Sequence, residues 1–190
     1  INNLMEASLG VKPWSEKDVW VEAGLIGSPF TNENPVSRDH IMYTRSLAAE
    51  YSPYYLAGVK ITAALSKRLK GSFYLLNGWQ TIRQEEEFPP AITGQLEFTL
   101  NKNNLFNWNV YYQDRETHRR IFSDIYWIGT KDKWKFTSCF YAGNDESKVP
   151  SPYRPNSIFH RDGFWCNANF AASYEIATNT NLSARVEFYQ

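Results

Sequence analysis

Ten charged side chains fall on the polar side of segments in which polar and apolar residues alternate. They carry both signs with no strong excess of either, which predicts the wet wall of a water-filled pore without marked ion selectivity. The alternative is that they pair with one another across neighbouring strands whatever the function. These residues are Glu6, Glu22, Lys60, Glu97, Arg120, Asp124, Lys135, Glu175, Arg185 and Glu187.

The segment from Ser37 to Tyr55 is the second candidate site, because it is rich in charged and hydrogen-bonding side chains. Folded into the mouth of a pore, it would narrow the opening and set its electrostatics, and long loops are usually functional or disordered. The alternative is a surface loop held in shape by an ion pair between Arg45 and Glu50. The residues concerned are Arg38, Asp39, His40, Tyr43, Arg45, Glu50, Tyr51 and Tyr54.

Catalytic and metal-binding signatures are missing from the sequence. It contains no G-x-S-x-G, H-E-x-x-H, Walker or C-x-x-C motif. His40, His118 and His160 lie in three different predicted loops, and we expect them to be exposed. The acidic run 85–87 is expected to be a solvated loop rather than a calcium site, which needs spaced ligands. The sequence therefore predicts no enzyme, no cofactor and no metal ion.

Composition restricts the partners of the chain. Its 190 residues include 20 basic and 20 acidic side chains, which gives no electrostatic reason to expect a nucleic-acid partner. No apolar run is long enough for a transmembrane helix, which needs about 18 or more residues. The mean hydropathy of −0.51 still fits a membrane β-barrel, because only alternate residues of its strands face lipid.

Period-two alternation predicts about ten β-strands and no helix. Most of these strands exceed the roughly 5–6 residues of soluble strands and match the about 9–11 that cross a bilayer. Short and long connections alternate, with long loops expected at 27–53 and 144–161, as in a barrel whose two rims differ. The predicted strands are 4–12, 19–26, 55–66, 69–75, 92–100, 106–113, 119–129, 134–141, 164–178 and 182–189.

Aromatic residues gather toward the ends of these strands. This placement is typical of the aromatic girdles at a membrane interface, although a soluble β domain would use the same residues as core. In the membrane interpretation Val59, Ile61, Leu96 and Phe98 face outward, whereas in a soluble sandwich they would be sealed between two layers. The girdle residues are Trp20, Tyr54, Tyr55, Trp79, Trp108, Tyr112, Trp127, Trp134 and Tyr141.

Several spaced motifs resemble one family of membrane proteins. The run Tyr43-Thr44-Arg45-Ser46-Leu47-Ala48-Ala49-Glu50-Tyr51-Ser52-Pro53-Tyr54-Tyr55, then Gly58-Val59-Lys60 and Leu76-Asn77-Gly78-Trp79-Gln80, resembles the OmpL-like outer-membrane porins of Bacteroidetes-type bacteria. Glu22-Ala23-Gly24 and Leu182-Ser183-Ala184-Arg185-Val186-Glu187 fit the same pattern. Members of that family are longer, so the resemblance implies an internal segment of a larger barrel.

Together these observations predict an all-β, antiparallel, transmembrane up-and-down β-barrel, complete or incomplete, that forms a single domain over residues 1–190. Its expected function is passive diffusion of small hydrophilic solutes through the outer membrane of a Gram-negative bacterium, with the lipid bilayer as its other partner. A homo-oligomer is left open. Two alternatives remain: a soluble lipocalin-like or sandwich binding module, and a plugged outer-membrane barrel with a structural or adhesive role.

Overall fold

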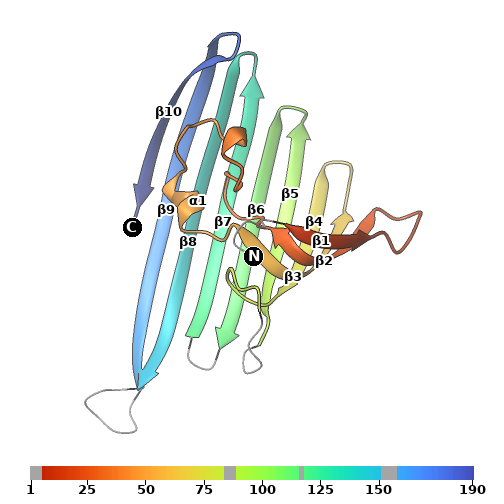
Figure 1. Cartoon of the computed structure of the whole chain (residues 1–190), viewed down its shortest axis with the longest axis vertical. Coiled ribbons are helices and arrows are strands. Elements are labelled where there is room, and N and C mark those ends of the chain that lie inside the picture. The colour runs from red at the N-terminus through yellow and green to blue at the C-terminus, as the bar shows by residue number, and fades with distance from the viewer. Residues whose placement is uncertain (1–5, 84–88, 116–117, 151–157) are drawn as a thin grey trace.

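The alternation of polar and apolar residues produces one antiparallel sheet in the computed structural model of the chain (Figure 1). The structure describes residues 6–83, 89–115, 118–150 and 158–190, without the side chains of 148–150 and 158–161. The start of the first predicted strand, the acidic run 85–87 and the side chain of His160 lie outside this description. The strands are β1 (Ala7–Val11), β2 (Val19–Gly27), β3 (Tyr55–Ala64), β4 (Leu69–Leu76), β5 (Ala91–Asn101), β6 (Asn104–Arg115), β7 (His118–Lys131), β8 (Trp134–Pro150), β9 (Ile158–Ala177) and β10 (Thr180–Tyr189).

Each strand pairs with its neighbours in the sequence, in the order β1 to β10. The prediction of an all-β, up-and-down antiparallel fold is confirmed. Within the described residues no pairing joins β1 to β10, so the sheet is open. Two short helical elements, η1 (Ser37–Asp39) and α1 (Leu47–Glu50), interrupt the connection between β2 and β3, where the sequence predicted no helix. No helix in the described part of the chain has the length and apolarity to cross a membrane.

The two faces of the sheet differ in polarity. Val59, Ile61, Leu96 and Phe98 are 39, 44, 37 and 39% exposed, so they are not sealed between two layers. This confirms the prediction that they face outward. The opposite face carries polar side chains together with a buried apolar cluster, and the connection 28–54 packs against it. We call this covered side the inner face, and the apolar side the outer face.

The buried apolar cluster lies on the inner face beneath that connection. Phe30, Leu56, Leu76, Tyr111 and Phe122 belong to it, and each is at most 2% exposed. The girdle prediction is wrong for two residues, because Tyr141 is fully buried in this cluster and Trp79 packs against it. Strand parity directs Tyr141 inward, and Trp79, which follows β4, packs against the rings of Phe30, Tyr111 and Phe122.

Other aromatic residues do form a continuous row on the outer face. Trp127 stacks on Phe106 and on Phe136, with ring centroids 6.4 and 6.0 Å apart. Trp134 continues the row by stacking on Phe136 at 5.6 Å. Trp134 directly follows the tight turn between β7 and β8, so the row approaches the rim of short turns. This is the arrangement expected of side chains at the boundary between lipid and water.

Strand length departs from expectation at the C-terminal end. The stretch 144–161 was predicted to be a loop, which is wrong for 144–150 and 158–161, because β8 continues to Pro150 and β9 begins at Ile158; residues 151–157 lie outside the described residues. The alternation of short and long connections also stops in the middle of the chain, because β6 ends at Arg115 and β7 begins at His118, directly after the short turn between β5 and β6. Cross-strand charge pairs extend the ladder: Arg120 binds Asp145 through two hydrogen bonds of 2.6 and 2.7 Å, and the next position pairs Arg119 with Glu146. Such pairs favour continued strand pairing.

Two glycines allow the first strands to bend. Gly24 on β2 and Gly58 on β3 face each other in the register and have φ of 135° and 156°. A Cβ atom on either would collide with the backbone of the neighbouring strand. Figure 1 shows β1–β3 turned away from the direction of the later strands. Glycine permits this local curvature, which a sheet needs in order to curl.

Candidate functional site

Residues 28–54 leave β2, cross the inner face over the C-terminal half of the sheet and return to β3 (Figure 1). We call them the inner segment. Its first contacts are made by the backbone: the Pro29 carbonyl accepts a 2.9 Å hydrogen bond from the Asn109 side chain. The Thr31 amide donates to Asp124 Oδ2 at 2.6 Å. Asn109 on β6 and Asp124 on β7 are both buried, so the inner segment covers the polar centre of these two strands. We call the sheet beneath the inner segment the wall.

Phe30 anchors the inner segment through aromatic packing. Its ring stacks on Trp79 with centroids 5.6 Å apart and meets Tyr111 and Phe122 edge-on at 6.2 and 5.2 Å. Phe30 is 2% exposed. Removing an aromatic ring of this burial from water is strongly favourable, so this contact holds the start of the inner segment in place.

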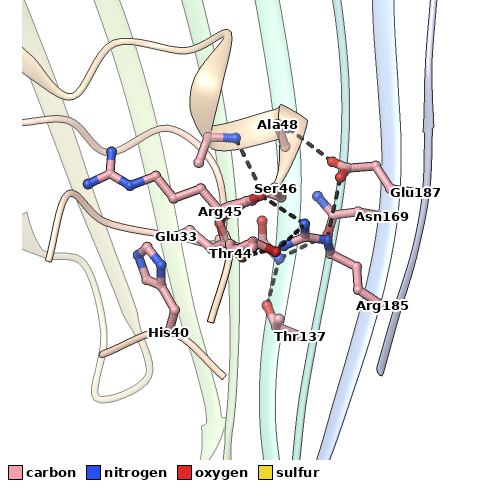
Figure 2. Close-up of polar contacts among 12 residues, drawn as sticks. Glu33, His40, Thr44, Arg45, Ser46, Ala48, Thr137, Asn169, Arg185 and Glu187 are labelled. Atoms are coloured by element: carbon pink, nitrogen blue, oxygen red, sulfur yellow. Dashed lines mark hydrogen bonds and ion pairs between the residues drawn. The ribbon is translucent and has the colours of Figure 1, made fainter. Parts of the chain in front are cut away.

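Arg185 on β10 forms the second anchor (Figure 2). Its Nη1 donates to the Thr44 carbonyl at 2.8 Å and its Nη2 to the Arg45 carbonyl at 2.8 Å. Its guanidinium also lies 3.6 Å from the Glu33 carboxylate and 3.5 Å from that of Glu187. The planar fork of arginine suits such divided contacts, so one wall side chain binds two separate parts of the inner segment.

The two carboxylates beside Arg185 organise the short helix α1. Glu33 Oε2 accepts hydrogen bonds from the Ser46 amide at 2.7 Å and the Ser46 hydroxyl at 3.0 Å. Ser46 is also the N-cap of α1, because its Oγ accepts from the Ala49 amide at 3.2 Å. Glu187 accepts from the Ala48 amide at 3.1 Å, so a wall carboxylate binds the first turn of this helix.

A row of amide side chains completes the contact. Asn32 donates through Nδ2 to Thr137 Oγ1 at 2.9 Å and to Asn169 Oδ1 at 3.0 Å. Asn169 in turn donates to Asn167 at 3.3 Å, and Asn167 donates to Glu187 at 3.0 Å (Figure 2 draws Asn169 and Glu187). This network joins β8, β9 and β10 beneath the inner segment, on the polar face of the sheet.

The residues proposed for the Ser37 to Tyr55 constriction fall into two groups. Arg45 and Tyr51 are engaged: the Arg45 guanidinium lies over the Tyr54 ring at 4.7 Å, and Tyr51 stacks on Tyr189 at 4.6 Å. The Tyr54 hydroxyl donates to Glu50 at 2.6 Å. Tyr54 therefore contacts both Arg45 and Glu50, and the structure shows this arrangement instead of the direct ion pair between Arg45 and Glu50 that was the alternative prediction. Burial and this hydrogen bond raise the pKa of Tyr54 above its ordinary value.

The other group comprises Arg38, Asp39 and Tyr43, which are exposed, and His40, which is half-buried. Among the described residues, the polar contacts of Arg38, Asp39 and His40 lie within the segment itself: Arg38 pairs with Asp39 at 3.5 Å, and the His40 ring lies 2.6 Å from the Asn34 carbonyl. Tyr43 is 100% exposed. In the described part of the chain, no hydrogen bond or ion pair joins these four side chains to the sheet.

The ten charged wall residues are not equivalent. Glu22 pairs with Lys60 at 2.6 Å, and Glu97 pairs with Lys70 at 3.3 Å. Arg120 binds Asp145 and lies between the rings of Trp79 and Trp165. Asp124, Arg185 and Glu187 bind the inner segment. The exposed side chains are Glu6, Lys135 and Glu175.

Comparison with known families identifies the family of the chain. The family model for OmpL-like beta-barrel porin-2 proteins matches residues 1–190. The chain belongs to this porin family. A search of curated proteins and a search of solved structures found no match. The observed sheet agrees with membership of this family, because an apolar outer face and a polar inner face are characteristic of the wall of a membrane β-barrel.

Sequence reasoning missed the residues that fix the inner segment of this porin. Phe30, Thr31, Asn32 and Glu33 precede the predicted constriction, and each gains at least one partner from a distant part of the chain. One signal was available in the strands: Asn107 and Asn109, like Asn167 and Asn169, repeat with period two at positions that central strands seldom give to asparagine. Within the described ranges, no group of three or more His, Cys, Asp or Glu side chains could hold a metal ion.

Proposed function

We propose that this chain forms the wall of a passive diffusion channel for small hydrophilic solutes in the bacterial outer membrane. We further propose that residues 1–190 act as one β-barrel domain within a longer barrel. The observation that carries the proposal is the polar inner face crossed by the inner segment, opposite an apolar outer face. The open sheet supports the larger barrel, because its two edge strands, β1 and β10, require partners in a membrane.

Selection in such a channel is steric and electrostatic. Apolar side chains of the outer face seal the wall against lipid, and the charged inner face keeps water in the lumen. The inner segment occupies lumen space and sets the cutoff for solutes. Charges that are already paired, such as Glu22 with Lys60, contribute little net field. Selection by charge therefore depends mainly on the exposed side chains of Glu6, Lys135 and Glu175.

Single-channel recording of the full-length protein in a planar bilayer tests this proposal. We expect an ohmic conductance in KCl, together with a size limit when neutral sugars enter proteoliposomes. A variant in which 38–43 is replaced by a Gly-Ser chain of the same length serves to test the inner segment, because in the described part of the chain no hydrogen bond or ion pair joins these residues to the sheet. It should change the solute cutoff while leaving folding intact.

The packing of Phe30 favours a second candidate function, in which the inner segment plugs the lumen and the barrel acts as a structural or adhesive surface platform. Three aromatic rings hold this residue, and the polar network around Arg185 holds the rest. A folded barrel that inserts into the bilayer but carries no current would support the platform and contradict the channel.

A further inference from the structure

A hollow of about 440 Å³ opens on the outer face of β3–β6. Its floor is made by two glycines on adjacent strands, Gly71 and Gly94, and its walls include Ile61, Phe73, Leu96 and Trp108. The lining is almost wholly aliphatic and aromatic. An open apolar hollow of this size and lining suits the chemistry of a hydrocarbon chain.

Gly71 and Gly94 matter because they lack side chains, which leaves the hollow open, and not because their backbone conformation requires glycine. The glycines with positive φ in the described residues are Gly24, Gly58 and Gly78, so neither Gly71 nor Gly94 is required by its backbone conformation. A Cβ atom built on Gly94 meets nothing within 4 Å. A larger residue would be accepted there by the fold and would fill the hollow. The hollow is thus a feature that a single side chain could remove.

One end of the hollow reaches a basic turn. Leu65 lines it, and the chain then turns through Ser66, Lys67 and Arg68 at the rim of short connections. Ser66 Oγ fixes this turn by accepting hydrogen bonds from the amides of Arg68 at 3.3 Å and Leu69 at 3.1 Å. Lys67 and Arg68 are exposed, and no ion pair in the described part of the chain involves either of them.

We propose that this site binds one anionic phospholipid of the surrounding bilayer. An acyl chain lies in the hollow over Gly71 and Gly94, and the phosphate contacts Lys67 and Arg68. This inference rests on the proposed function only for the placement of the outer face in lipid. Apolar contact alone gives little preference among lipids, because their tails are as apolar as leucine. The basic turn supplies the selectivity, because lysine and arginine near a membrane surface attract anionic headgroups.

Native mass spectrometry of the full-length protein in detergent, titrated with phosphatidylglycerol or phosphatidylcholine, tests the site. We expect saturable retention of one phosphatidylglycerol and much weaker retention of phosphatidylcholine. Replacing both Lys67 and Arg68 with glutamine should weaken phosphatidylglycerol binding by about 25-fold, or about fivefold for each basic residue. The matched control replaces Lys102 and Lys131, which lie on neighbouring turns of the same rim, and should leave that binding unchanged.

A second pair of variants separates the hollow from general attraction to the rim. Gly94→Leu fills the hollow and should abolish the retained lipid, whereas Ala184→Leu adds the same side chain to the exposed outer face of β10 and should retain it. Equal binding in these two variants, or equal loss in the two charge variants, would overturn the proposal. A second copy of the chain bound in place of lipid would do so too. Lipid binding is measured independently of ionic current. A barrel that retains phosphatidylglycerol but carries no current would therefore contradict the proposed channel function and leave the lipid site supported.

Discussion

Replacing Arg185 with alanine is expected to release the inner segment from the wall of the sheet. The substitution removes hydrogen bonds to the carbonyl groups of Thr44 and Arg45 and leaves Glu33 and Glu187 without their cation. The side chains of Arg185, Glu33 and Glu187 are only 15, 4 and 10% exposed, so water compensates poorly for the loss.

The magnitude follows from this burial. Removing one partner of a buried charge pair costs about 3–5 kcal/mol, mainly because the other charge stays buried without compensation. That loss corresponds to roughly a hundredfold to a thousandfold or more in the equilibrium between the bound and released inner segment. Arg185→Lys keeps the charge but lacks the planar fork, so we expect an intermediate effect.

Hydrogen exchange of residues 28–54 in detergent, followed by single-channel recording, measures the outcome. Arg185→Ala should speed hydrogen exchange of the Ala48 amide. In single-channel recording it should raise the current or make the current through the open channel fluctuate. Lys135→Ala serves as the control, since it removes an exposed charge of the same face, and it should change neither readout. Unchanged exchange and unchanged current in Arg185→Ala would refute the role of Arg185 as an anchor of the inner segment.

Three further substitutions test other parts of the structure. Phe30→Ala should destabilise the docked inner segment by about 3–5 kcal/mol, seen as lost protease protection, and full protection would contradict the aromatic anchor. Ser46→Ala removes the N-cap of α1 and one hydrogen bond of Glu33, so it should cost about 1 kcal/mol in the same assay, far less than Phe30→Ala. Leu96→Arg should destabilise the protein folded in lipid vesicles by about 2–4 kcal/mol in a denaturant titration, whereas Glu175→Arg, at an exposed position of the inner face, should cost little; equal costs would deny that the faces differ.

The alternation of residues was sufficient to predict the strands and their two faces. In β5, for example, Leu96 and Phe98 are exposed on the outer face, while Thr93 is buried on the inner one. Period two fixes this assignment without knowledge of any partner. The stretch 144–161 was misjudged because its charges and prolines resemble a loop. Asp145 and Glu146 act in a strand only because Arg120 and Arg119 face them across the ladder.

The contacts of the inner segment could not be predicted from local sequence. Thr31 binds Asp124, which lies 93 positions further along the chain, and Asn32 binds Asn169 across 137 positions. Composition predicted a constricting role for the polar connection before β3, and this role stays a prediction; among the residues it named, Arg45 packs on Tyr54 and Tyr51 stacks on Tyr189. It gave no sign of Phe30, because a single phenylalanine before a polar stretch acquires its aromatic partners only through the fold.

Spin-label accessibility along β5 in lipid bilayers tests the central claim most directly. With Cys139 and Cys166 replaced, single labels at Ile92, Leu96 and Phe98 should be reached by oxygen dissolved in lipid. Labels at Gln95 and Glu97 should instead be reached by a water-soluble nickel reagent, with a period of two residues. Uniform accessibility along β5, or an alternation of the opposite sign, would contradict an apolar wall around a water-filled interior.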